Sequence, residues 1–172
     1  MEQEINSMLS QTKKSLEHQY NTRLEFKPKE IAIEILKILN GQPLNREYKY
    51  FFWPTASLAL SLEVAHSQAQ REDLLDILIT YYKRWARKGG RLYYLDQIMN
   101  GYTLLYLFEI DGEWWIKESL QKMSNYIEKY PRTSTGGLPY RTNNPEVTLV
   151  DYLGMICPFL SRYGRTFNSE EA

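Results

Sequence analysis

The sequence predicts an all-α fold in which helical hairpins stack side by side. Apolar residues recur at helical spacing along most of the 172 residues, and glycine or proline ends most of these runs. Strand signals are nearly absent, apart from a possible small ribbon on either side of Asn143-Asn144. The length fits one domain, residues 1–172, with a sizeable core.

Two helices are expected ahead of the hairpins. The first covers Gln3–Tyr20 within a peripheral segment, residues 1–20, because it carries few apolar positions. The second covers Lys29–Asn40, and Gly41 with Pro43 ends it. Its broad apolar face consists of Ile31, Ile35, Leu36, Ile38 and Leu39.

The first hairpin pairs an inner helix with an outer one. The inner helix, Pro54–Gln68, is rich in alanine, which suits close packing on several sides, and it follows the aromatic segment REYKYFFW that ends at Trp53. The outer helix, Arg71–Lys88, has one apolar face and ends at Gly89-Gly90.

Two further hairpins follow. The second comprises a helix over Asp96–Ile110, a tight turn at Asp111-Gly112 and a return helix over Glu113–Tyr130. The third begins at Tyr152 after a long polar loop, and its turn is expected from Tyr163-Gly164 through Asn168. The sequence Ser169-Glu170-Glu171 resembles the start of another outer helix.

An aspartate precedes the inner helix of the second and of the third hairpin. Asp96 and Asp151 lie 55 positions apart (151 minus 96), which is one helical hairpin. If hairpins stack with helix axes about 8–10 Å apart, both carboxyl groups end on one rim and face one space. The alternative for Asp151 is a simple capping role at the helix that follows it.

Composition excludes several kinds of partner and site. Lysine plus arginine balance aspartate plus glutamate, 21 against 21, with no basic stripe, so neither nucleic acid nor an anionic membrane is an expected partner. Cys157, the single cysteine, is expected to be a buried apolar residue, and His18 and His66 are expected in surface or packing positions. We therefore expect no metal site, no cofactor, no membrane span and a cytoplasmic location.

Aromatic residues make up 14% of the chain, which suits a carbohydrate pocket because large rings stack on sugar faces. Trp53, Tyr94 and Tyr102 are candidate stacking platforms, and core packing is the alternative for each.

The segment from Tyr94 to Gly164 resembles the unsaturated uronyl hydrolases, the unsaturated rhamnogalacturonyl and glucuronyl hydrolases built on an (α/α)6 barrel. The matching features, in the family's order, are the D-x-x-x-x-G helix that starts at Asp96, the PRT-x-x-GG loop and the V-D-x-L-x-M-x-x-P-F-L helix that contains Asp151. The resemblance implies about half of an (α/α)6 barrel, namely helical hairpins of an (α/α) toroid.

The resemblance also implies an activity. Family members release an unsaturated uronic acid from pectin- or glycosaminoglycan-derived oligosaccharides by hydrating its C4=C5 double bond. Asp96 and Asp151 then correspond to the family's two essential aspartates. Our hypothesis assigns Asp151 as the acid/base and Asp96 as its electrostatic, substrate-orienting partner. An ordinary two-carboxylate glycosidase is the competing chemistry.

The chain departs from the family in the loop, where Pro139 and Tyr140 replace an aromatic residue and a histidine, and Leu149 replaces a tryptophan. Tyr140 and Arg141 are candidate contacts to the sugar hydroxyls and to the uronate carboxylate, and plain loop positions are the alternative.

Half a ring would leave an apolar flank of inner helices exposed. We therefore expect a homodimer that covers the flank, a fragment of a longer product, or a paralogue without catalysis that serves in protein interaction.

Overall fold

The structure is a computed structural model that describes residues 2–21, 28–40 and 51–167, and the structural statements below concern these residues. Its helices are α1 (Glu2–Asn21), α2 (Pro28–Leu39), α4 (Trp53–Ala69), α5 (Glu72–Arg87), the 3-10 helix η1 (Leu95–Asn100), α6 (Gly101–Asp111), α7 (Trp114–Glu128), α8 (Tyr152–Met155) and α9 (Cys157–Phe167). Within these ranges there is no strand, and the expected ribbon is a single antiparallel bridge between Arg141 and Asn144. The all-α prediction is confirmed.

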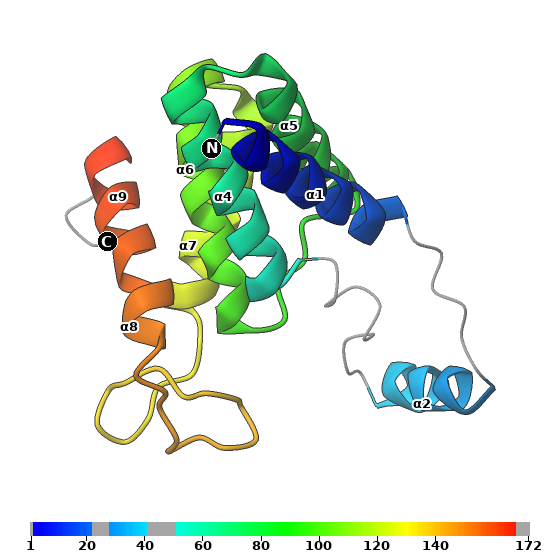
Figure 1. Cartoon of the computed structure of the whole chain (residues 1–172). Coiled ribbons are helices and arrows are strands. Elements are labelled where there is room, and N and C mark those ends of the chain that lie inside the picture. The colour runs from blue at the N-terminus through cyan, green and yellow to red at the C-terminus, as the bar shows by residue number, and fades with distance from the viewer. Residues whose placement is uncertain (1, 22–27, 41–50, 168–172) are drawn as a thin grey trace.

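The helices form the two layers of a partial (α/α) toroid, as predicted. Helices α4, α6 and α9 stand in a row, each in contact with the next (Figure 1). Helices α5 and α7 pack behind this row, and α1 packs on α4 and α5. Successive inner helices are therefore parallel neighbours whose first residues lie at one end of the molecule.

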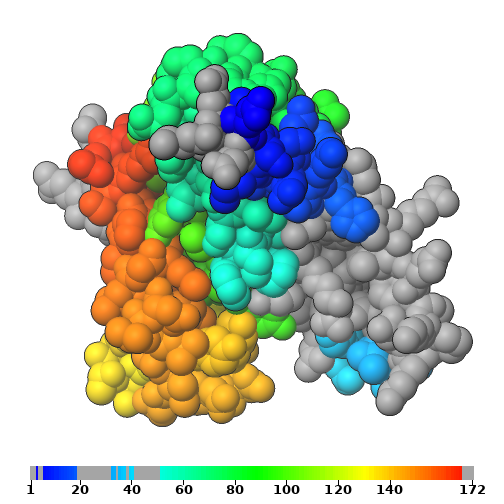
Figure 2. All heavy atoms as spheres, in the orientation of Figure 1, coloured from blue at the N-terminus to red at the C-terminus, as the bar shows by residue number. Residues whose placement is uncertain are grey.

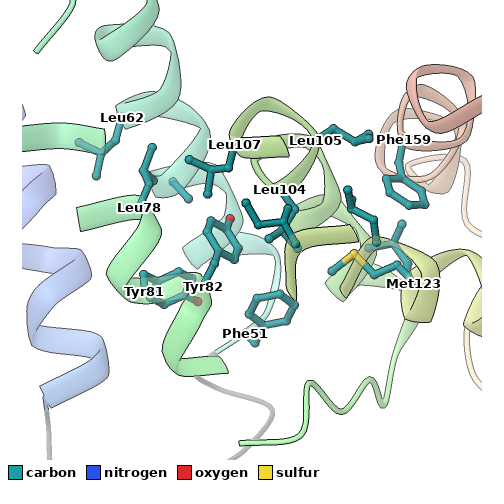
Figure 3. Packing of buried hydrophobic residues seen from close by; sticks show 14 of the residues in the cluster. Phe51, Leu62, Leu78, Tyr81, Tyr82, Leu104, Leu105, Leu107, Met123 and Phe159 are labelled. Atoms are coloured by element: carbon teal, nitrogen blue, oxygen red, sulfur yellow. The ribbon is translucent and has the colours of Figure 1, made fainter. Parts of the chain in front are cut away.

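A core of leucine and aromatic side chains fills the space between the layers (Figure 3). Phe51 lies in it just ahead of α4, with its ring stacked 4.0 Å from that of Trp85 and edge-on to that of Tyr82. The largest fully buried side chains are Tyr82, Phe51, Phe159, Leu16, Leu62, Leu74, Leu78, Leu95, Ile98, Leu104, Leu105 and Leu107.

The turns of the first two hairpins lie where the sequence predicts them. Helix α6 ends at Asp111, and Gly112 follows with φ 64°, a left-handed conformation that favours glycine. Helix α5 ends at Arg87, and Gly89 and Gly90 both have positive φ.

The inner helix of the third hairpin differs from the prediction because it is broken. Helix α8 ends at Met155, and α9 begins at Cys157 after Ile156 with φ −107°. Pro158 lacks an N–H group, and inside a continuous helix its ring would clash with the carbonyl of Gly154 four residues earlier, so the helix cannot continue regularly through this point. The expectation of a buried Cys157 is wrong, since this residue is exposed.

The predicted turn at Tyr163-Gly164 is also wrong, because α9 continues to Phe167. The Phe167 ring lies 5.1 Å from that of Phe108 and 4.7 Å from that of Tyr163, so packing against α6 holds the last turn despite the glycine. Asn168 and the predicted helix start at Ser169-Glu170-Glu171 lie outside the described residues.

Helix α2 forms as predicted, but the described side chains of its predicted apolar face are exposed. In Figure 1 it lies to one side of the other helices, and Ile35, Leu36 and Leu39 are exposed. The side chains of Ile31 and Ile38, the predicted stop at Gly41 and Pro43, and the aromatic segment as far as Tyr50 lie outside the described part.

None of the described helices combines the length and the apolar character that crossing a membrane would require. His18 is exposed and His66 is buried.

Candidate active site

A cavity of about 240 Å³ opens at the end of the molecule where the inner helices begin. It is lined by Trp53, Asp96, Tyr140, Leu149, Asp151, Tyr152 and Met155. In Figure 2 the loop after α7 and helix α8, yellow to orange, cover this end beside the start of α4, in cyan. The structure thus brings both aspartates to one cavity, together with side chains from all three hairpins.

Asp96 lies inside η1, where only 6% of its surface is exposed. The residue is therefore held by a 3-10 turn that precedes α6, and it does not occupy the first position of a regular α-helix. This arrangement presents a carboxylate to the cavity from a buried segment.

Gln97 is a positioning residue that sequence reasoning missed. Its Oε1 accepts hydrogen bonds from the backbone N–H groups of Tyr93 (2.6 Å) and Tyr94 (3.0 Å), and its Nε2 donates to the Phe51 carbonyl (2.7 Å). The fully buried amide thereby fastens the start of α4, with Trp53, to η1. The sequence did contain a signal for it, because Gln97 stands three residues after Tyr94, the residue that precedes η1, and this is the spacing of a capping box.

Asp151 differs from Asp96 in being exposed. It precedes α8, but its side chain makes no capping hydrogen bond, so the capping alternative is wrong. Its carboxylate makes no hydrogen bond or ion pair with any described residue. The side chain is therefore available to a ligand in the cavity.

The loop that leads to Asp151 is folded on itself. The backbone N–H of Gly137 donates to Thr133 Oγ1 (2.8 Å), and the Glu146 carboxylate accepts from Ser134 Oγ (2.7 Å) and from the Ser134 N–H. Gly136 has φ 85°, which few other residues adopt. These bonds explain the threonine and the glycine pair of the PRT-x-x-GG segment as turn-forming residues.

The candidate binding residues are placed differently from one another. Trp53 and Tyr140 line the cavity, and 47% of the Trp53 surface is exposed. Tyr94 and Arg141 lie behind this lining, where the guanidinium pairs with Asp96 at 3.3 Å. Tyr102 is outside the lining, and its hydroxyl donates to the Gly154 carbonyl of α8 at 2.5 Å.

The pKa values of two groups around the cavity are set by burial and by the Asp96–Arg141 pair. Burial raises the pKa of the Tyr152 phenol far above its ordinary value, so Tyr152 stays a hydrogen-bond donor. Burial alone would lower the pKa of Arg141, but Asp96 and two tyrosines raise it overall, so its charge is permanent. Across the described residues there is no group of three or more His, Cys, Asp or Glu side chains placed to hold a metal ion.

Comparisons with known proteins agree with this architecture. Residues 10–172 match the family Glycosyl Hydrolase Family 88. The chain is 26% identical over 125 residues to the protein named Unsaturated rhamnogalacturonyl hydrolase YesR from Bacillus subtilis (strain 168). That match covers 69% of this chain and 36% of the relative, so the chain corresponds to about a third of the relative's length. No solved structure matches the chain. Because the family match extends over almost the whole sequence and the helical layers fit it, the chain belongs to Glycosyl Hydrolase Family 88.

Proposed function

We propose that the chain carries the acid-bearing part of a hydrolase site for unsaturated uronyl oligosaccharides derived from pectin or glycosaminoglycans. The observation that carries the proposal is that Asp96 and Asp151, from successive hairpins, line one cavity. Aromatic and apolar side chains around two carboxylates are the usual lining of a sugar pocket. The name of the B. subtilis relative supports the unsaturated substrate class.

The proposed reaction is a hydration. The Asp151 carboxylic acid protonates C4 of the C4=C5 double bond, and positive charge develops at C5. Water then adds at C5 while the Asp151 carboxylate takes its proton, which regenerates the acid. The resulting hemiketal opens by breaking the bond between C5 and the ring oxygen, and the hemiacetal left at C1 releases the rest of the saccharide as an alcohol.

The surroundings of the two acids suit different tasks. Asp151 makes no hydrogen bond within the described part of the chain, so it is free to exchange protons with substrate and water. Asp96 is buried and paired with Arg141, which suits a fixed negative charge that stabilises the cation at C5 and orients the sugar. In this scheme Trp53 stacks on a sugar ring and Tyr140 contacts a hydroxyl.

The test uses the full chain and a panel of unsaturated disaccharides, followed by the absorbance of the conjugated double bond. We expect wild type to remove the absorbance of at least one panel member and Asp151→Asn to slow the reaction by about a hundredfold or more. Asp76→Asn, which changes an exposed aspartate on α5, is the control and should keep full activity. Full activity of Asp151→Asn, or a saturated sugar as product, would contradict the mechanism.

A second candidate function is a helical-repeat protein without catalysis that associates with itself. It is favoured by three exposed apolar side chains beside the cavity, namely Val147, Val150 (80%) and Leu153 (64%). If wild type leaves the whole panel unchanged, sedimentation should show a concentration-dependent dimer that Leu153→Glu dissociates. The cytoplasmic location stays a prediction.

A further inference from the structure

Two aromatic rings flank the guanidinium of Arg141. Its guanidinium carbon lies 4.2 Å from the centre of the Tyr94 ring and 4.1 Å from the centre of the Tyr140 ring. Contact with two rings limits the positions that a guanidinium can take and shields it in part from water. Beside these rings Nη2 donates to Asp96 Oδ2 at 3.3 Å.

The other end of the guanidinium reaches the segment that carries the second acid. Nη1 donates to the Tyr140 carbonyl at 3.0 Å and to the Tyr152 hydroxyl at 3.4 Å. The Tyr152 hydroxyl itself donates to the same Tyr140 carbonyl at 2.9 Å. Tyr152 directly follows Asp151 in the chain. The Arg141 side chain is therefore bonded both to the first acid, Asp96, and to the residue next to the second acid.

We infer that Arg141 is a positioning residue that fixes the Asp96 and Asp151 segments relative to each other. The inference rests on the proposed function. It replaces the role that the sequence suggested for Arg141, which was contact with the uronate carboxylate. Three of its hydrogen bonds are directed at oxygens of the protein, two rings flank its guanidinium, and its side chain is only 20% exposed. Arg141 therefore acts on the substrate through Asp96 and not by binding the uronate.

Arginine is required for this task and lysine is not an equivalent. A lysine keeps the charge, but its ammonium is a point donor that cannot contact two rings while it bonds oxygens at two separate ends. Arg141→Lys should therefore recover only a small part of what Arg141→Met loses.

The kinetic test compares Arg141→Met in wild type and in the Asp96→Asn background. We expect kcat to fall about a hundredfold with little change in KM in wild type, because small displacements of reacting groups have effects of this size. In the Asp96→Asn background the same change should cost less than about threefold, since residues that act as a unit are not additive. A rise in KM with kcat preserved, an equal loss in both backgrounds, or full activity of Arg141→Lys would overturn the inference.

A second measurement does not depend on activity. Amide NMR spectra of the full chain should show that Arg141→Met shifts residues 95–97 and also residues 151–153. The matched control is Arg91→Met, which removes an exposed arginine close to η1 in sequence and should shift neither acid-bearing segment. Shifts confined to one segment would overturn the inference. If wild type is inactive on every disaccharide, the proposed function fails while this measurement still decides whether Arg141 connects the two segments.

Discussion

The ring of Phe159 lies directly on Gly101, so closely that a Cβ built on the glycine would stand 2.5 Å from Phe159 Cε2. Gly101 is the first residue of α6, just after the turn that carries Asp96, and Phe159 belongs to the helix that follows Asp151. The contact therefore brings the second and third inner helices together beneath the cavity. It also explains why the D-x-x-x-x-G motif ends in glycine.

Gly101→Ala should destabilise the chain although alanine is the better helix former. Helix propensity favours alanine over glycine by about 1 kcal/mol. We expect the clash to exceed this gain, so that the net loss of stability is about 1–3 kcal/mol, because the Phe159 ring has to move. Urea unfolding measures the change. Gly154→Ala is the matched control, since nothing lies within 4 Å of a Cβ at that glycine, and it should be neutral or stabilising. A stabilised Gly101→Ala would contradict the packing.

Arg162→Met should loosen α9 from the other inner helices. The Arg162 guanidinium pairs with Glu109 of α6 at 2.7 Å and with the buried Glu63 of α4 at 3.5 Å. Its removal leaves Glu63 without its counter-charge, at a cost of about 2 kcal/mol, less than for a fully buried pair because Arg162 is partly exposed. Glu109→Gln changes an exposed partner and should cost less than about 1 kcal/mol. Equal unfolding midpoints for the two variants would contradict this assignment.

Glu63 should make stability fall as pH rises. Burial raises the pKa of Glu63 above its ordinary value of 4.5, although Thr103 and Arg162 act in the opposite direction. The folded state therefore holds this proton more tightly than the unfolded state does. Its stabilising effect is complete below pH 4.5 and is lost as pH rises from there through the folded pKa. Thermal unfolding between pH 4 and 7 should show this slope in wild type and a flatter one in Glu63→Gln.

Trp53→Ala should weaken substrate binding with little effect on folding. The side chain is half exposed in the cavity, so we expect KM to rise about threefold to tenfold, the range of an aromatic contact. The free energy of unfolding should change by less than about 1 kcal/mol. Trp114→Ala removes a tryptophan that is 74% exposed and does not line the cavity, and it should leave KM unchanged. Identical KM values for both variants would exclude Trp53 from binding.

Tyr102→Phe separates a structural role from the stacking role predicted from the sequence. The lost hydrogen bond to the Gly154 carbonyl should cost about 0.5–1.5 kcal/mol of stability, while KM stays constant because Tyr102 does not line the cavity. Tyr126→Phe, whose hydroxyl has no hydrogen-bond partner in the described part of the chain, is the control for stability. A raised KM for Tyr102→Phe would restore the stacking role.

The hairpin pattern was predictable because helical periodicity and glycine stops are local signals. Asp111-Gly112 and Gly89-Gly90 end their helices where the sequence indicates. The break before Pro158 also had a local signal, which the strong apolar run concealed. The continuation of α9 past Gly164 had none, since it depends on the contact of Phe167 with Phe108 of another helix.

The cavity was predictable only in part. The spacing of Asp96 and Asp151 placed them on successive hairpins, and the structure brings both to one lining. The two aspartates differ in burial, and the Arg141 guanidinium lies beside the rings of Tyr94 and Tyr140. Both features depend on how a loop folds back over η1. Such long-range polar contacts leave no periodic trace in a sequence.

The break between α8 and α9 has a consequence for how the cavity is lost. Its outer wall is a single helical turn, followed by a helix that buries one side chain, Phe159, and is otherwise held by Arg162 and by the contact of Phe167 with Phe108. A segment secured at so few points opens by sub-global unfolding while the leucine-rich layers remain intact. Hydrogen exchange at residues 152–167 should thus report a lower opening free energy than at α4 or α6, and catalytic competence would disappear at denaturant concentrations where most of the helical ellipticity survives.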